Sequence, residues 1–214
     1  KEIALSLIKS VDIFVENMRP GKAEKIGLGW DKVSSINNKI VYCSISAFGQ
    51  DGPFAKRGAY DHVVQGMTGI MSTTGTKESG PTKVGAPYID YATGLNAAFA
   101  ITAALHETKQ NNKPIRLDVS MMDTSLLLMA NMVTEHLNSG WIPTPMGNEA
   151  QSGSPSSGMY KTKTVPILLA ANNDIQFFNL CDALNSIQEF DKEKWKVEQN
   201  RKKYQNELRD EIQK

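Results

Sequence analysis

Two short β-branched runs separated by helical segments constrain the fold of this chain more than any other feature. Residues 11–16 (VDIFVE) and 39–46 (KIVYCSIS) are predicted to be buried strands, because apolar and β-branched side chains dominate both. An amphipathic segment at 2–9 precedes the first run, and a helix is predicted over 31–36, between the two. This alternation of helix and strand predicts a parallel, Rossmann-like α/β sheet.

Residues 81–105 predict a loop that turns into a long helix. Gly85 and Pro87 interrupt the approach, and the helical pattern begins at Asp90. Side chains of one helical face then recur every three or four residues, at Leu95, Ala98, Phe99, Thr102 and Leu105. Asp90 is therefore predicted to lie at a helix N-terminus.

An aspartate at that place has two interpretations. Asp is a preferred N-cap, because its side chain accepts hydrogen bonds from amides that lack helical partners. The same amides and the helix dipole favour an ionised carboxylate, and such a carboxylate can act as a nucleophile. The local pattern around Asp90 leaves both roles open, and they are compatible.

Composition predicts the domain organisation. We expect a large Rossmann-like domain over 1–139, a Gly/Ser/Pro-rich linker or loop over 140–158, and the start of a smaller α/β domain over 159–214. Further helices are predicted over 60–72, 121–137 and 192–214. The chain has no initiator methionine, and both ends fall within helical patterns, so we expect a fragment of a longer protein that lacks segments at both ends.

Charge and motifs exclude several classes of function. The net charge of +1 does not suggest a nucleic-acid partner, and no apolar run is long enough to predict a membrane span. Cys43 and Cys181 are far apart and fit buried thiols in a reducing compartment, which predicts the cytoplasm. A mitochondrial location stays open, because the N-terminal segment that would carry a targeting signal is expected to be missing. No metal site is predicted, because the three histidines are isolated: His62, His106 and His136.

Basic residues follow both predicted strands. Arg19, Lys22 and Lys25 come after the first strand, and Lys56 and Arg57 come after the second. Ligands of open parallel sheets bind beyond the carboxyl ends of the strands, where cationic side chains suit phosphate groups. The alternative is ordinary solubilising surface charge.

Several segments occur in an order that resembles a known family. They are VDIFVENMRPGKAEKIGLGW (11–30), IVYCSISAFGQDGPF (40–54), RGAYD (57–61), MTGIMSTTG (67–75), VGAPYIDYATGLNAAFAITAAL (84–105) and LDVSMMD (117–123). In this order they resemble the class III CoA-transferases of the CaiB/BaiF type. The resemblance implies a CoA-binding large domain, an acyl-CoA and a small carboxylic acid as substrates, no metal, and an interlocked homodimer for the full-length protein.

The resemblance also implies roles for individual residues. The family's nucleophilic aspartate lies in a Gly-x4-Asp-x3-Gly context, which Gly85, Asp90 and Gly94 match. Asp90 would then carry the acyl group as an anhydride and afterwards carry CoA as a thioester. The family's CoA contacts correspond here to Asn17, Met18, Arg19, Lys25, Arg57, Gly58, Ala59 and Tyr60.

Other functions of the same fold stay open. Related acyl-CoA racemases carry a catalytic histidine where this chain has Tyr60, and tyrosine is a poor base at neutral pH. His62, two residues on, is expected to point elsewhere on the helix. An acyl-CoA racemase or epimerase and an inactive CoA-binding fragment are therefore the alternatives. A plain dinucleotide-binding domain would predict a G-x-G-x-x-G motif, which the sequence lacks.

Overall fold

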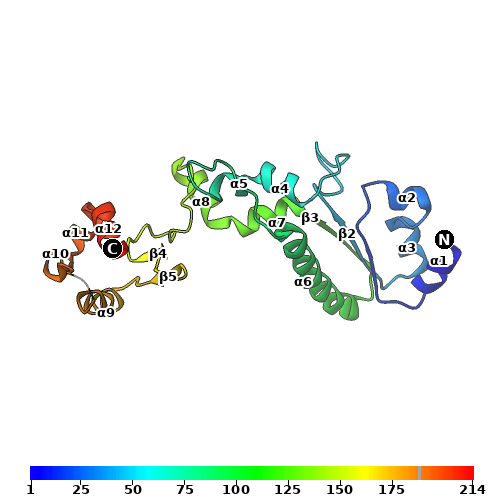
Figure 1. Cartoon of the computed structure of the whole chain (residues 1–214). Coiled ribbons are helices and arrows are strands. Elements are labelled where there is room, and N and C mark those ends of the chain that lie inside the picture. Colours follow the sequence, from blue (N-terminus) through cyan, green and yellow to red (C-terminus); the bar gives the residue numbers. More distant parts are fainter. Residues whose placement is uncertain (188) are drawn as a thin grey trace. The chain divides into compact units, whose positions relative to one another are not determined.

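The computed structural model describes residues 1–187 and 189–214 and shows a mixed α/β protein (Figure 1). The chain divides into two compact units. The first comprises residues 1–74 and 81–144, and the second comprises residues 75–80 and 145–214. Each unit contains its own hydrophobic core. The main change from the first unit to the second falls between Thr144 and Pro145. The domain limits predicted from the sequence, 1–139, 140–158 and 159–214, stay a prediction.

The first unit is built on a three-stranded parallel sheet. Strand β1 (Ile13–Glu16) pairs with β2 (Val41–Ser46), and β2 pairs with β3 (Ile115–Ser120). All three strands run in the same direction, so their carboxyl ends lie at one edge of the sheet. The predicted Rossmann-like parallel sheet is confirmed.

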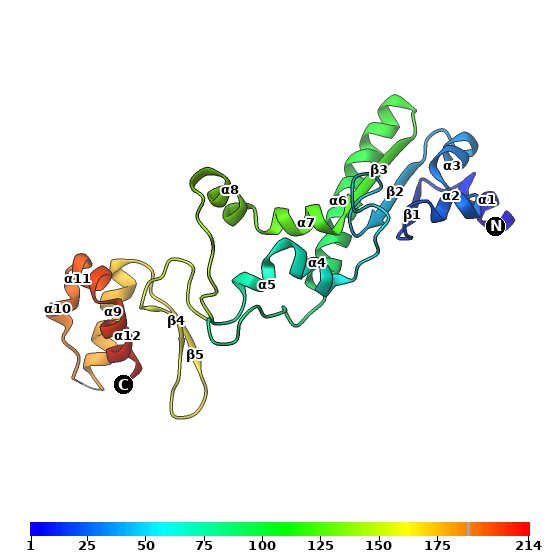
Figure 2. The same cartoon turned by 90° about the horizontal axis from the view of Figure 1, so that it is seen from above.

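Helices cover the two faces of this sheet. Side chains alternate along β2, so Tyr42 packs among residues of α1 (Glu2–Ile8) and α3 (Trp30–Ile36) while Cys43 packs against α6 (Tyr88–Asn111). Figure 2 shows α6 beside β2 and β3, and α3 beside β1 and β2. Cys43 is a fully buried free thiol, as predicted.

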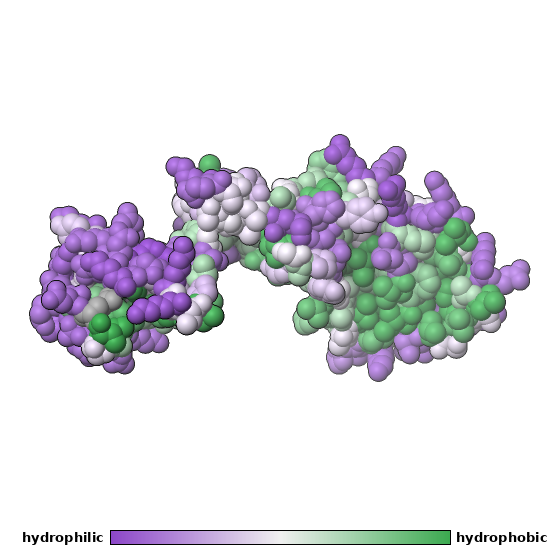
Figure 3. Space-filling model, in the orientation of Figure 1, coloured by the Kyte–Doolittle hydropathy of each residue, from purple (hydrophilic) through white to green (hydrophobic). Residues whose placement is uncertain are grey.

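Helix α6 meets the sheet through small side chains. Thr93, Ala97 and Ala104 are buried, whereas Leu95 and Phe99 are 74% and 76% exposed. The helix predicted from the spacing exists, but the face that carries its largest apolar residues points outward, because the small residues let the helix approach the strands closely. Figure 3 shows an extended apolar area on the surface of this unit.

Two of the predicted helices in this unit are interrupted. The helix expected over 60–72 is two helices, α4 (Asp61–Thr68) and α5 (Ile70–Thr73), because Gly69 takes a left-handed conformation with φ of 89°. The helix expected over 121–137 is likewise divided at Met129, into α7 (Met121–Leu128) and α8 (Ala130–Ser139).

The second unit joins a hairpin to a group of helices. The hairpin pairs β4 (Ser157–Tyr160) with β5 (Ile167–Ala170) in antiparallel fashion, and α9 (Asp174–Asn185) follows it. The core of this unit consists of Tyr160, Phe177, Cys181, Phe190, Trp195, Leu208 and Ile212. Cys181 is thus the second buried free thiol that the sequence predicts.

The charged segment 192–214 does not form the single helix predicted for it. It forms α10 (Lys192–Lys196), α11 (Glu198–Lys203) and α12 (Gln205–Gln213). Trp195 and Leu208 both reach the same core, and the chain therefore turns twice to bring them there. No helix in the described part of the chain is both long enough and apolar enough to span a membrane.

Candidate active site

A pocket of about 190 Å³ lies at the carboxyl ends of β1 and β2 in the first unit. Its walls come from the turn after β1, the end of β2 and the loop before α4: Asn17, Met18, Arg19, Pro20, Ser46, Ala47, Arg57, Gly58, Ala59 and Tyr60. Seven of the eight candidate CoA contacts are therefore brought together. The eighth, Lys25, lies on α2 (Lys22–Ile26) and is not among the lining residues.

Local contacts hold the two walls of this pocket. Glu16 is buried, and its Oε2 accepts a hydrogen bond from the amide of Met18 at 2.8 Å. Gly58 allows a close approach of the two walls, since a Cβ there would lie 2.8 Å from Nε of Arg19. The guanidinium of Arg57 lies 4.7 Å from the centre of the Phe54 ring.

Neither arginine of this pocket forms an ion pair with a carboxylate among the described residues. Every ion pair found among the described residues joins side chains of the second unit, so neither Arg19 nor Arg57 takes part in one. Two free guanidinium groups at the ends of parallel strands suit an anionic ligand, because they offer several hydrogen-bond donors to phosphate oxygens.

Asp90 lies in the first turn of α6, as predicted, and is exposed. Of the two interpretations of Asp90, the N-cap is wrong. The helix begins at Tyr88 with Pro87 as its N-cap, so Asp90 is already the third helical residue. Asp90 thus lies at the helix end without serving as its cap.

The capping role belongs instead to Asp61, the first residue of α4. This side chain is only 7% exposed, and its Oδ2 accepts hydrogen bonds from the amide of Ile89 at 2.7 Å and from that of Asp90 at 3.3 Å. The first-turn amides of Tyr88 and Tyr91 donate to backbone carbonyls. Sequence reasoning missed Asp61, although the RGAYD segment contains it.

This arrangement reverses the expected electrostatics of Asp90. Desolvation, followed by the charge of Asp61, raises the pKa of the Asp90 carboxyl above its ordinary value. The sequence predicted the opposite, an ionised form stabilised by helix amides, but those amides already bind Asp61.

Tyr60 and His62 form an aromatic pair beside the pocket. Their rings are parallel within 7° and their centres lie 6.4 Å apart. The expectation that His62 points elsewhere is therefore wrong. Tyr60 precedes α4 in an extended conformation, with φ of −106° and ψ of 166°, so helical spacing does not govern the relation between the two side chains.

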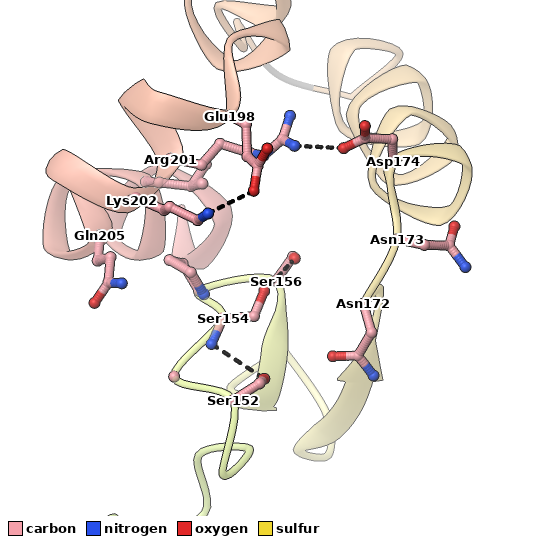
Figure 4. A pocket seen from close by; sticks show the side chains of 13 residues that line it. Ser152, Ser154, Ser156, Asn172, Asn173, Asp174, Glu198, Arg201, Lys202 and Gln205 are labelled. Carbon is pink, nitrogen blue, oxygen red and sulfur yellow. Dashed lines mark hydrogen bonds and ion pairs between the residues drawn. The ribbon is translucent and has the colours of Figure 1, made fainter.

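A larger pocket, of about 710 Å³, lies within the second unit (Figure 4). Hydroxyl and amide groups dominate its lining, which includes Ser152, Ser154, Ser156, Asn172, Asn173 and Gln205. Its charged groups pair with one another: Arg201 binds Asp174, and Lys202 binds Glu198. The sequence predicted no site here, only a Gly/Ser/Pro-rich linker or loop over 140–158.

A parallel sheet with a cationic pocket at its strand ends defines an α/β protein suited to a phosphate-bearing ligand. The model of CoA-transferase family III matches residues 1–214, and the chain belongs to this family. The resemblance noted from the sequence is thereby confirmed.

Individual relatives agree with this assignment. Succinate–glutarate CoA-transferase of Agrobacterium fabrum is 35% identical over 178 residues, which are 83% of this chain and 44% of that protein. Acetyl-CoA:oxalate CoA-transferase of Acetobacter aceti is 32% identical over 187 residues, 87% of this chain and 48% of that protein. A crystal structure of a CaiB/BaiF family protein from Brucella suis shares 31% identity with a TM-score of 0.88 and covers 99% of this chain and 56% of its own. The chain thus spans about half the length of these relatives.

Proposed function

We propose that the protein transfers CoA from an acyl-CoA donor to a free carboxylic acid, with Asp90 as the nucleophile. The observation that carries this proposal is the carboxylate of Asp90, which is exposed in the first turn of α6 while Asp61 takes the capping bonds. The names of the two relatives pair CoA transfer with glutarate and oxalate, which favours a small dicarboxylic acid as acceptor.

The proposed reaction proceeds through two kinds of covalent intermediate on Asp90. A carboxylate oxygen attacks the donor's thioester carbon, the C–S bond breaks, and CoA leaves as a thiolate. The thiolate attacks the side-chain carbonyl of the resulting anhydride, which releases the donor acid and forms an aspartyl-CoA thioester. The acceptor carboxylate attacks this thioester, and the released thiolate then takes the acceptor's acyl group and regenerates the carboxylate.

The pocket at the strand ends would hold part of the CoA molecule. CoA is much larger than this cavity, so a phosphate group beside Arg19 and Arg57 is the portion that fits its charge. Asn17, Met18, Gly58, Ala59 and Tyr60 would contact the adjoining atoms, and Lys25 would meet a phosphate beyond the lining. Binding energy at this distance from the reacting carbon can position the thioester.

For the complete protein, two further proposals stay in place. One is a homodimer. The other is a reducing compartment, the cytoplasm or the mitochondrion, which the two buried free thiols support.

Replacement of the nucleophile tests the reaction directly. In Asp90→Ala we expect transfer to fall by about three orders of magnitude or more, with acyl-CoA binding retained because Asp90 does not line the pocket. Asp31→Ala is the matched control, since Asp31 is also an exposed first-turn aspartate, on α3. Transfer rates and equilibrium binding of acyl-CoA would be measured for both. Full transfer by Asp90→Ala would contradict the proposal.

A second candidate, an acyl-CoA racemase or epimerase, gains support from the parallel pair of Tyr60 and His62. An imidazole can act as a general acid or a general base in proton transfer at the α-carbon. The test is incubation of acyl-CoA in deuterated water without an acceptor acid. Exchange of the α-proton favours this function, and its absence together with CoA transfer to added acids rejects it.

A further inference from the structure

Gln65 makes hydrogen bonds both to Asp61, which caps α6, and to the loop that precedes α6. It lies on α4 and is completely buried. Its Nε2 donates a hydrogen bond to Oδ1 of Asp61 at 2.5 Å, and its Oε1 accepts one from the amide of Val84 at 2.9 Å. Both ends of one carboxamide are thus engaged, one by the residue that caps α6 and one by the loop that precedes α6.

The bond from Gln65 leaves Asp61 with both carboxylate oxygens occupied. Oδ1 receives Gln65, and Oδ2 receives the amides of Ile89 and Asp90. The orientation of the Asp61 carboxylate, and with it the direction of the first turn of α6, is therefore defined from two sides. Lys83 adds to the order of the loop, since its Nζ donates to the carbonyl oxygens of Val84 and Gly85.

We infer that Gln65 is a positioning residue for the Asp90 carboxylate in CoA transfer, an inference that rests on the proposed function. The neutral carboxamide of Gln65 donates to a carboxylate through its nitrogen and accepts from an amide through its oxygen, without adding a charge to this buried place. A glutamate would bring a second negative charge to Asp61, and an apolar side chain would leave two buried polar groups without partners.

The position of α4 itself does not depend on Gln65. Thr68, at the end of α4, lies within hydrogen-bond distance of Ser125 on α7, with 2.8 Å between the hydroxyl oxygens. Apolar contacts of Val64 and Ile89 also join α4 to α6. Loss of Gln65 should therefore displace the cap and the loop while the helices stay packed. Covalent catalysis is sensitive to displacements of about 1 Å, so kcat should fall.

The affinity for acyl-CoA should be preserved, because Gln65 does not line the pocket at the strand ends. A residue that merely stabilised the fold would lower the fraction of active protein without a change in kcat per folded molecule. The combination of a reduced kcat and an unchanged KM for acyl-CoA therefore distinguishes positioning from stabilisation.

The test uses the protein expressed from its complete reading frame. Transfer of CoA from succinyl-CoA to glutarate and from acetyl-CoA to oxalate is measured for the wild type, for Gln65→Met and for Asn96→Leu. Asn96→Leu is the matched control, since it removes another hydrogen bond of α6, to Thr124 on α7, away from Asp61. Folded protein is quantified by circular dichroism and thermal unfolding.

We expect Gln65→Met to lower kcat per folded molecule at least tenfold, with KM for the acyl-CoA within twofold, and Asn96→Leu to keep kcat within twofold. Should Gln65→Met fail to fold, Gln65→Asn replaces it, because the shorter carboxamide stays polar but cannot span Asp61 and Val84. Equal kcat for the Gln65 variant and the control overturns the inference. A wild type that transfers no CoA to any acid of a panel overturns the proposed function instead, and the inference falls with it.

Discussion

The two pockets of the molecule differ in how they treat charge. The pocket of the first unit is small, about 190 Å³, and its Arg19 and Arg57 have no ion-pair partners among the described residues. The pocket of the second unit is larger, about 710 Å³, but its Arg201 and Lys202 are both paired with carboxylates. The larger cavity is thus electrostatically satisfied, and the smaller one is not.

This difference favours the smaller cavity as the proposed site of an anionic ligand. A guanidinium that already has a carboxylate partner gains little from a phosphate, whereas an unpaired one gains a charge-assisted hydrogen bond. Arg201 also donates to the carbonyl oxygen of Trp195 at 2.9 Å and lies 4.6 Å from the centre of the Phe177 ring. These contacts give Arg201 a structural role beside the core of the second unit, so cavity size alone is a poor guide to the proposed site.

The largest expected effect is a loss of acyl-CoA affinity when Arg19 and Arg57 are replaced. We expect the double replacement by alanine to weaken acyl-CoA binding about a hundredfold, about 2.7 kcal/mol, because two charge-assisted bonds to phosphate are lost. The midpoint of urea unfolding should change little, since neither side chain has an ion pair to lose and only the contact of Arg57 with the Phe54 ring is removed. Isothermal titration with a non-reactive acyl-CoA analogue measures the affinity. A Kd within twofold of the wild type would contradict the proposal that this pocket binds the phosphate of acyl-CoA.

The reverse result is expected in the second unit. Arg201→Leu should lower the free energy of unfolding by about 2 kcal/mol, because Asp174 and two backbone carbonyl oxygens lose their partner. Affinity for acyl-CoA should not change. Urea unfolding followed by tryptophan fluorescence is suitable, since Trp195 lies in this core. Weaker acyl-CoA binding in this variant, with stability retained, would assign the ligand to the larger pocket.

The smallest expected effect is a shift in the pKa of the Asp90 carboxyl when the charge of Asp61 is removed. Asp61→Asn removes a negative charge that raises the pKa of the Asp90 carboxyl, and it also replaces one of the two acceptor oxygens by a donor. The pKa of Asp90 should fall towards its ordinary value, while the larger contribution, desolvation, remains. A raised pKa in the folded state means that stability falls as pH rises through it, and in the variant this loss should move to lower pH. A carbon-13 NMR titration of Asp90 measures the shift, and an unchanged or higher pKa would contradict the assignment.

Local patterns predicted the sheet but not the faces of its helices. The strand that contains Tyr42 and Cys43 could be predicted from its β-branched and apolar run. Successive side chains of a strand point to opposite faces, and this alternation depends only on neighbouring residues. The outward direction of Leu95 and Phe99 could not be predicted, because it depends on how closely small residues allow α6 to approach the sheet. The division of the segment 192–214 also depends on a distant core, which periodicity does not record.

The candidate site shows the same limit. Arg19 and Arg57 could be placed from the order of elements, because a turn and a loop follow neighbouring strands. The resemblance to the family supplied the other predicted pocket residues. The roles of Asp61 and Gln65 were missed, because their partners Ile89 and Val84 lie 28 and 19 residues away along the chain. A cap supplied by another helix leaves no signature in the sequence of the helix that it caps.

The central claim is that the carboxylate of Asp90 becomes covalently bound during transfer. Mass spectrometry of the peptide that contains Asp90, after brief incubation of the protein with succinyl-CoA and acid quench, tests this most directly. The account predicts a mass increment on Asp90, removed by hydroxylamine and absent from Asp90→Ala. An unmodified Asp90 peptide in protein that is transferring CoA, or an increment on a different residue, would contradict it.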